Sequence, residues 1–155
     1  MDNKIRIIRK EEDLYRIDIS DDGKEIVLDL ADIALPLKIN RVFNKAQNNI
    51  NSTRSKIKVL ENRTGNDDSV GVMTRFEHDL NQTLVDMYRE NRKIMDEVFG
   101  EGAIQTLFGD TDYIDMYDDL FELLEPHFDK IELNVEGIKN RLAKKYGKQD
   151  TTTLT

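Results

Sequence analysis

Two histidines are the residues best suited to acid–base chemistry, because imidazole is the side chain whose ordinary pKa lies nearest to neutral pH. They are His78 and His127. Neither belongs to a nucleophile motif, nor to a metal motif such as two histidines four residues apart on a helix. We therefore interpret both as histidines on helix surfaces, and we expect no catalytic residue, no cofactor and no enzyme activity.

A stretch in the middle of the chain partly matches a calcium-binding loop. Asn66, Asp68, Gly71 and Glu77 fall at positions 1, 3, 6 and 12 of a twelve-residue window. That loop also needs an oxygen ligand at its fifth position, where Val70 provides none. The sequence therefore predicts a loop that leads into a capped helix, and no metal site.

Carboxylates between positions 110 and 125 recur at steps of three and four residues, so several share one helix face: Asp110, Asp112, Asp115, Asp118, Asp119, Glu122 and Glu125. A metal site of the helix-bundle type would need Glu-x-x-His partners on facing helices, and the chain has none. We interpret these residues as an acidic face that is solvated or that binds a basic partner.

Charge is divided unevenly along a chain whose net charge is −8. Residues 38–63 carry seven Lys or Arg and one Glu, whereas residues 64–138 have a net charge of −14. Because the acidic part repels phosphate, duplex nucleic acid is not expected as a partner. The basic residues spread around a predicted helix that lacks a recognition turn. They indicate a solvated face, or one paired with the protein's own acidic half.

The 155 residues are enough for the core of one ordinary domain, expected over 1–147. The absence of cysteine excludes disulfides and thiolate chemistry and fits a cytoplasmic protein. No apolar run approaches the roughly 20 residues that span a bilayer, and the N-terminal residues lack the apolar core of a signal peptide. No membrane partner is expected. Residues 148–155 have no apolar period and are predicted to be disordered.

The elements that must position these side chains are an N-terminal β-hairpin and a bundle of about four to five helices, a mostly α (α+β) fold. Alternating apolar residues around Asp22 and Gly23 predict the hairpin over about 14–30, and residues 4–9 suggest a third short strand. After Pro36, apolar residues at alternating steps of four and three form a heptad pattern: Ile39, Phe43, Ala46, Ile50, Thr53, Ile57 and Leu60.

Helices are predicted over about 37–63, 74–99, 103–108, 111–125 and 127–146. Residues 64–71 are rich in glycine and small polar residues and predict a flexible loop. Thr74 and Glu77 have the spacing of a capping box at the start of the second helix. Its apolar face is expected at Phe76, Leu80, Leu84, Met87, Ile94 and Val98.

Glycine and proline mark the remaining helix boundaries. Gly100 and Gly102 are expected to end the second helix and Gly109 the third, because glycine tolerates the left-handed turn after a helix. Pro126 is expected to kink or restart the last helix. The acidic helix before it should bury one face, made of Tyr113, Ile114, Tyr117, Leu120, Phe121 and Leu124.

Three short motifs lie in the second half of the chain. They are Asp-Glu-Val-Phe-Gly-Glu-Gly at 96–102, Leu-Phe-Gly-Asp at 107–110 and Tyr-Asp-Asp-Leu-Phe-Glu-Leu-Leu-Glu-Pro at 117–126. These motifs, and the order of elements over 14–130, resemble the small tail assembly chaperones of siphophages and of prophages in Gram-positive bacteria. The structural positions that carry the resemblance are Phe99, Gly100, Gly102, Phe108, Gly109 and Pro126.

The resemblance implies a non-enzymatic helper that coats the tape measure protein and recruits tail tube subunits around it. It also implies action in the host bacterial cytoplasm and absence from the mature virion. Coating a long helical partner calls for exposed helix grooves and self-association. We therefore predict a homo-oligomer and protein-binding residues on the acidic face and the heptad pattern: Asp115, Asp118, Asp119, Glu122, Ile39, Phe43, Ile50, Ile57 and Leu60.

Two other functions stay open at the level of the sequence. A structural virion component such as a head–tail connector would use the same helices to build a permanent ring. A helical regulator would instead bind a host protein. For the heptad pattern, the alternative to self-association is an antiparallel partner within the chain, the helix predicted near 73–99.

Overall fold

The computed structural model describes residues 4–146, except for the side chains of 132–139, 141–142 and 145–146. The elements follow in the order η1 (Glu11–Asp13, a 3-10 turn), β1 (Leu14–Asp18), β2 (Glu25–Asp29), α1 (Leu35–Glu61), β3 (Ser69–Val70), β4 (Met73–Thr74), α2 (Arg75–Phe99), α3 (Ala103–Phe108) and α4 (Met116–Tyr146). This order confirms the mostly helical fold with an N-terminal hairpin. The tail predicted over 148–155 lies outside the described residues.

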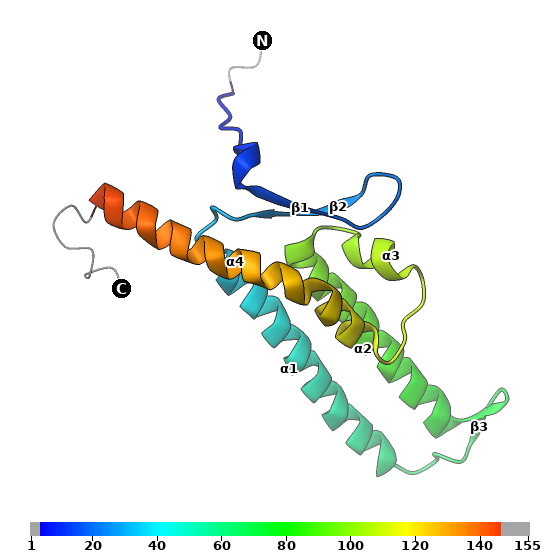
Figure 1. Ribbon diagram of the computed structural model, residues 1–155. Helices are drawn as coiled ribbons and strands as arrows, with labels where there is room; N and C mark the ends of the chain where they lie inside the picture. The colour runs from blue at the N-terminus through cyan, green and yellow to red at the C-terminus, as the bar shows by residue number, and fades with distance from the viewer. Residues whose placement is uncertain (1–3, 147–155) are drawn as a thin grey trace.

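The long helices α1 and α2 lie side by side and form the frame of the molecule (Figure 1). The β1–β2 hairpin, α3 and α4 gather at one end of this pair, which we call the near end (Figure 1). Of the described elements, the other end carries only the β3–β4 hairpin, and it is called the far end. Helix α4 crosses over the near end.

The N-terminal hairpin forms as its turn residues predict. β1 and β2 pair antiparallel, with Ile17 opposite Ile26 and Tyr15 opposite Leu28. Gly23 has a φ of 90°, a left-handed conformation that suits glycine at a tight turn. Ile26 and Leu28 are buried, so this strand supplies one wall of the core.

The third short strand predicted over 4–9 is wrong, since these residues form no strand and belong to no sheet. The physical reason lies in Arg9. Its Nε donates to Asp29 Oδ2 at 2.6 Å, which ties it to the end of β2. The chain that precedes Arg9 projects away from the helices instead of lying along β1 (Figure 1).

The buried residues of helix α1 differ from those that the heptad pattern predicts. Leu35, Val42, Ala46 and Thr53 are buried. The other heptad residues, which had been expected at the contact, are half-buried: Ile39, Phe43, Ile50, Ile57 and Leu60. The reason is that α2 packs along only part of the apolar stripe. The partner of this stripe within the chain is α2, and self-association through it stays a prediction.

A polar layer crosses the middle of the α1–α2 contact. Asn49 Nδ2 donates to Asn91 Oδ1 at 2.8 Å and to the carbonyl oxygen of Met87 at 3.1 Å. Asn91 and Thr53 are both buried. Because a buried amide is costly without a partner, this pair favours one register of α1 against α2.

The apolar core lies at the near end, where three layers meet. Its buried members come from β2 and every helix: Ile26, Leu28, Leu35, Val42, Ala46, Ile94, Met95, Phe99, Ala103, Ile104, Met116, Leu120, Leu124 and Ile131. The α2 residues expected to face the core closer to the far end are only half-buried: Phe76, Leu80, Leu84 and Met87. No third layer covers them in the part of the chain that is described.

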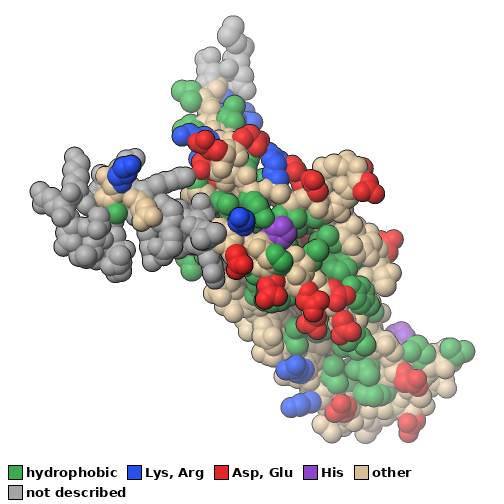
Figure 2. Space-filling view, viewed as in Figure 1, with side chains coloured by type: hydrophobic (Ala, Val, Ile, Leu, Met, Phe, Trp, Pro, Cys, Tyr) green, Lys and Arg blue, Asp and Glu red, His purple; other side chains and the backbone are tan. Residues whose placement is uncertain are grey.

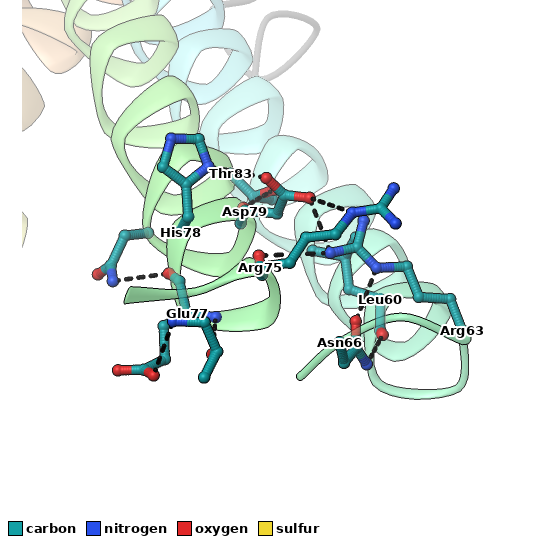
Figure 3. A network of polar contacts seen from close by, with 10 residues as sticks. Leu60, Arg63, Asn66, Arg75, Glu77, His78, Asp79 and Thr83 are labelled. Carbon is teal, nitrogen blue, oxygen red and sulfur yellow. Dashed lines mark hydrogen bonds and ion pairs between the residues drawn. The ribbon is translucent and has the colours of Figure 1, made fainter. Parts of the chain in front are cut away.

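Polar contacts organise the far end (Figure 3). The Arg63 guanidinium donates to Asn66 Oδ1 at 2.7 Å and pairs with Asp79 at 2.7 Å. Asn66 Nδ2 donates to the carbonyl oxygen of Leu60 at 2.8 Å. Hydrogen bonding from His78, followed by that from Arg63, lowers the pKa of Asp79. These contacts close the connection between α1 and α2.

The connection itself is more ordered than the flexible loop predicted over 64–71. Ser69 pairs with Thr74 and Val70 with Met73, so a second small hairpin leads into α2. The capping box is confirmed, because the Glu77 N–H donates to Thr74 Oγ1 and the Thr74 N–H donates to Glu77 Oε1.

The two helices predicted on either side of Pro126 are one continuous helix, α4. Proline removes one helical N–H, which leaves the carbonyl of Glu122 without its usual donor. Pro126 and Glu122 are both exposed, so water can reach that carbonyl. Leu120 and Leu124 before the proline and Ile131 after it are buried in one core. This shared burial stabilises the helix across the proline.

Candidate protein-binding surface

The motif residues at 96–109 build the turn that places α4. Asp96 caps α3, because its carboxylate accepts from the N–H of Gly102 at 3.0 Å and from that of Ile104 at 3.1 Å. Gly100 and Gly109 have positive φ values of 111° and 65°. They end α2 and α3, as predicted. Sequence analysis did not single out Asp96 as a cap.

Arg92 of α2 then fixes the connection between α3 and α4. Its side chain, 12% exposed, pairs with Asp112 at 2.5 Å and donates to the carbonyl oxygens of Gly109 and Thr111 at 2.8 and 2.9 Å. Residues 111 and 112 therefore form a tethered loop, and the helix predicted to begin at 111 begins at Met116. Arg92 was missed, although it is one of only five Lys or Arg in the acidic segment 64–138.

Two tyrosines hold the first turn of α4 against α2. The Tyr117 hydroxyl donates to the carbonyl oxygen of Tyr88 at 2.9 Å, and the Tyr88 hydroxyl donates to that of Ile114 at 2.8 Å. The two rings stack with centroids 5.8 Å apart. Burial raises the pKa of Tyr117 well above its usual range.

The buried face of this region differs from the predicted one. Leu120 and Leu124 are buried as expected, together with Met116. Tyr113, Ile114 and Phe121 are 39%, 86% and 46% exposed, so their predicted burial is wrong. Because α4 begins at Met116, the positions at i, i+4 and i+8 face the core. Ile114 precedes the helix, and Phe121 points about 100° away from Leu120.

The outer surface of these turns combines carboxylates with apolar side chains. All four predicted acidic residues are exposed there: Asp115, Asp118, Asp119 and Glu122. Next to them in the sequence lie large exposed apolar side chains: Tyr113, Ile114, Phe121 and Leu123. We call these eight residues the α4 face. Figure 2 shows acidic side chains gathered over the first turns of α4, with hydrophobic side chains around them.

The heptad residues are not brought into this surface as a group. Phe43 is the exception, because its ring packs edge-on against Phe121 and Phe128, with centroids 6.2 and 6.4 Å away. Ile50 and Ile57 lie further along α1 toward the far end. The predicted binding residues therefore fall into two separate regions.

Some basic residues of α1 pair with the protein's own carboxylates, one of the two interpretations given by the sequence. Lys45 pairs with Glu97 of α2 at 3.0 Å, and Lys38 pairs with Asp32 at 2.6 Å. Arg63 pairs with Asp79, as described above. These contacts occupy part of the basic face.

A cleft of about 630 Å³ lies between the β1–β2 hairpin and the helices. Its β side is formed by residues 16–21 and Ile26, and its helical side by Leu107, Leu123, Leu124 and His127. His127, expected on the helix surface, is half-buried, and its Nδ1 shares a hydrogen bond of 2.5 Å with the Tyr15 hydroxyl. We call this space the hairpin cleft.

Within the described residues, no group of three or more His, Asp or Glu side chains is arranged to hold a metal ion. No helix in the same part of the chain has the length and apolar character needed to cross a membrane. Comparison with known proteins finds no matching family model, no matching curated protein and no matching solved structure.

Proposed function

We propose that this chain is a non-enzymatic tail assembly chaperone that binds a tape measure protein and recruits tail tube subunits during tail morphogenesis. The observation that supports this function is the α4 face, where exposed carboxylates are flanked by large exposed apolar side chains. The motifs at 96–102, 107–110 and 117–126, which resemble those of tail assembly chaperones, are the ones that build and position this face.

The geometry suits a protein partner because contacts with α2 fix the position of the α4 face. Arg92 tethers the preceding loop, and Tyr88 and Tyr117 fix the first turn. A surface held in this way loses little conformational freedom on binding. Ile114 and Phe121 supply apolar contact, which provides most of the affinity. The carboxylates orient the partner and speed association.

Co-expression with the tape measure protein of the same genome tests the function directly. A chaperone that covers apolar helix surface raises the soluble yield of that protein, measured in the supernatant after lysis. An equal yield with and without the chain would reject the proposal.

The surface itself is tested by the triple variant D115K/D118K/D119K. The residues are exposed, so the variant should fold, and its complex with the tape measure protein should weaken or form in the wrong orientation. A matched control reverses three exposed acidic residues elsewhere, E61K/D67K/E101K, with the same change in net charge. Equal loss of binding in both variants would indicate a general effect of charge and not this face.

Mass spectrometry of purified particles separates a chaperone from a permanent component. The chaperone is expected to be absent from mature virions. Detection at a fixed copy number would favour the head–tail connector instead. Pull-down of a host enzyme in place of a tail protein would favour the helical regulator.

A further inference from the structure

The residues before η1 form a segment without secondary structure that combines basic and aliphatic side chains. Ile5, Ile7 and Ile8 are 95%, 87% and 83% exposed. Residues 4–10, which we call the arm, contain four Lys or Arg and no acidic residue. Three large aliphatic side chains exposed to solvent so close together in the sequence indicate a surface that is buried when a partner binds. The arm also projects away from the rest of the molecule (Figure 1).

The base of the arm is fixed, which limits where the rest can reach. Arg9 pairs with Asp29 at 2.6 Å and with Asp13 at 3.7 Å, and the Asp13 N–H donates to the carbonyl oxygen of Lys10 at 3.0 Å. Residues 4–8 lie beyond this anchor. Five extended residues span roughly 17 Å, the length of a strand such as β1.

The hairpin cleft offers a strand edge of matching length. Residues 16–20 line the cleft in succession, whereas β2 contributes only Ile26, so the edge nearest the cleft belongs to β1. The sheet has two strands, and β1 has β2 as its one neighbour among the described residues. Among the described residues, no strand pairs with the second edge of β1.

The backbone of β1 is oriented to pair with a further strand. The Ile19 N–H donates to the carbonyl oxygen of Lys24, and the Asp13 carbonyl accepts from Leu30. With Ile17 opposite Ile26, this register turns the odd-numbered residues of β1 toward β2. The N–H and C=O groups of Arg16 and Asp18 consequently point to the open edge.

We propose that the arm of one copy of this chain docks in the hairpin cleft of a second copy, as an added strand beside β1. Ile5 and Ile7 share one face of the arm and cover the apolar side of the cleft at Leu107 and Leu123. Arg6 then lies on the outer face, the side of Asp18. The acidic Asp18 and Asp21 on the cleft complement a segment that has only basic charges.

The occupant comes from another copy because the arm leaves the hairpin at the wrong end to fill its own cleft. The cleft borders the β1–β2 turn at Ile19, Ser20 and Asp21. The arm starts at the opposite end of β1 and is directed away from it by the Arg9–Asp29 pair. This contact goes beyond the proposed function and does not depend on the identity of any tail protein.

Disulfide trapping tests the contact directly, since the chain has no cysteine of its own. Ile5→Cys and Leu123→Cys are purified separately, mixed and oxidised. A disulfide-linked pair of the two variants is expected in clear excess over the control pair Val72→Cys with Leu123→Cys, because Val72 is fully exposed at the far end. Equal yields of the two pairs would overturn the proposal.

The double variant Ile5→Cys/Leu123→Cys distinguishes exchange between copies from closure within one chain. Exchange gives linked dimers and larger species on a non-reducing gel. A disulfide confined to the monomer would show that the arm folds onto its own cleft, and it would overturn the proposal.

Sedimentation velocity over a range of concentrations measures the contribution of the arm to association. I5D/I7D should raise the dissociation constant between copies roughly tenfold or more. At a concentration where the wild type is monomeric, the thermal unfolding of the variant should match that of the wild type, because both side chains are then exposed. The matched control I33D/V72D places the same charge at two other exposed aliphatic positions and should associate normally. A wild type that stays monomeric, or an arm variant that associates equally well, would reject the contact.

Discussion

The near and far ends of the α1–α2 pair both have apolar residues on the sides where the helices pack, but the two ends are stabilised differently. At the near end, Phe99, Ile104 and Leu120 are buried because β2, α3 and α4 cover the two helices. At the far end, Leu60 and Leu80 lie in a layer of two helices and are only half-buried. Polar contacts around Arg63 supply much of the order there (Figure 3). Apolar periodicity thus marks which face packs, while the number of covering layers decides how deeply it is buried.

The largest expected effect is a core truncation at the near end. Leu120→Ala removes a side chain that is 1% exposed and leaves a cavity, so we expect a loss of about 2–5 kcal/mol in the free energy of unfolding. Urea denaturation followed by circular dichroism measures it. Leu80→Ala at the far end is the matched control and should cost about 1 kcal/mol. Equal losses would show that the two ends are packed alike.

The polar layer between the two ends gives the next prediction. Asn91→Ala removes one of the two acceptors of the Asn49 amide, leaving only the carbonyl oxygen of Met87, and should cost about 1–3 kcal/mol. The double variant N49L/N91L removes both amides and should recover most of that loss, because no polar group is left unsatisfied. If the double variant loses as much free energy of unfolding as the single variant, the two asparagines contribute more to stability than the hydrogen bond that each provides for the other.

Tyr117 gives a prediction at alkaline pH. Because its folded pKa is raised above the unfolded value, its contribution to stability is complete below about pH 10 and is lost as pH rises through the folded pKa. Tyr117→Phe should lose about 0.5–1.5 kcal/mol at pH 7 with its hydrogen bond to Tyr88. Above pH 10, however, its free energy of unfolding should fall less steeply than that of the wild type. Parallel pH profiles would contradict this assignment.

The smallest effect is expected at the far end, from Asp79→Asn. The pKa of Asp79 is lowered in the folded state, so its stabilisation is present above the unfolded pKa and is lost as pH falls through the folded pKa. The variant should therefore differ from the wild type at neutral pH and converge with it in acid. Since the carboxylate is only half-buried, added salt should reduce the difference as well. A difference that persists at low pH would point to a packing effect.

The sequence predicted best the features that depend on neighbouring residues. Gly23, Gly100 and Gly109 mark turns and helix ends because each has a positive φ that glycine tolerates. The capping box of Thr74 and Glu77 is equally local. Each of these signals acts within a few residues, so the order of elements could be predicted before any packing was known.

The errors arose where distant residues decide the outcome. Pro126 lies inside a helix because Leu120, Leu124 and Ile131 share a core that favours continuity over a break. The segment 4–9 forms no strand because Arg9 is held by Asp29, twenty residues away. Asp112 was expected on an acidic helix face and instead pairs with Arg92 in the loop before α4. None of these partners can be identified from spacing.

For the candidate surface, the sequence by itself determined that Asp118, Asp119 and Glu122 share one side of a helix, because a period of 3.6 residues places them there. Only the tertiary structure decided what lies beside them. It placed Met116 and Leu120 in the core and thereby left Phe121 and Ile114 at the surface. The physical reason is that the rotation of a helix about its axis is set by the layers it packs against, and those layers come from remote parts of the chain.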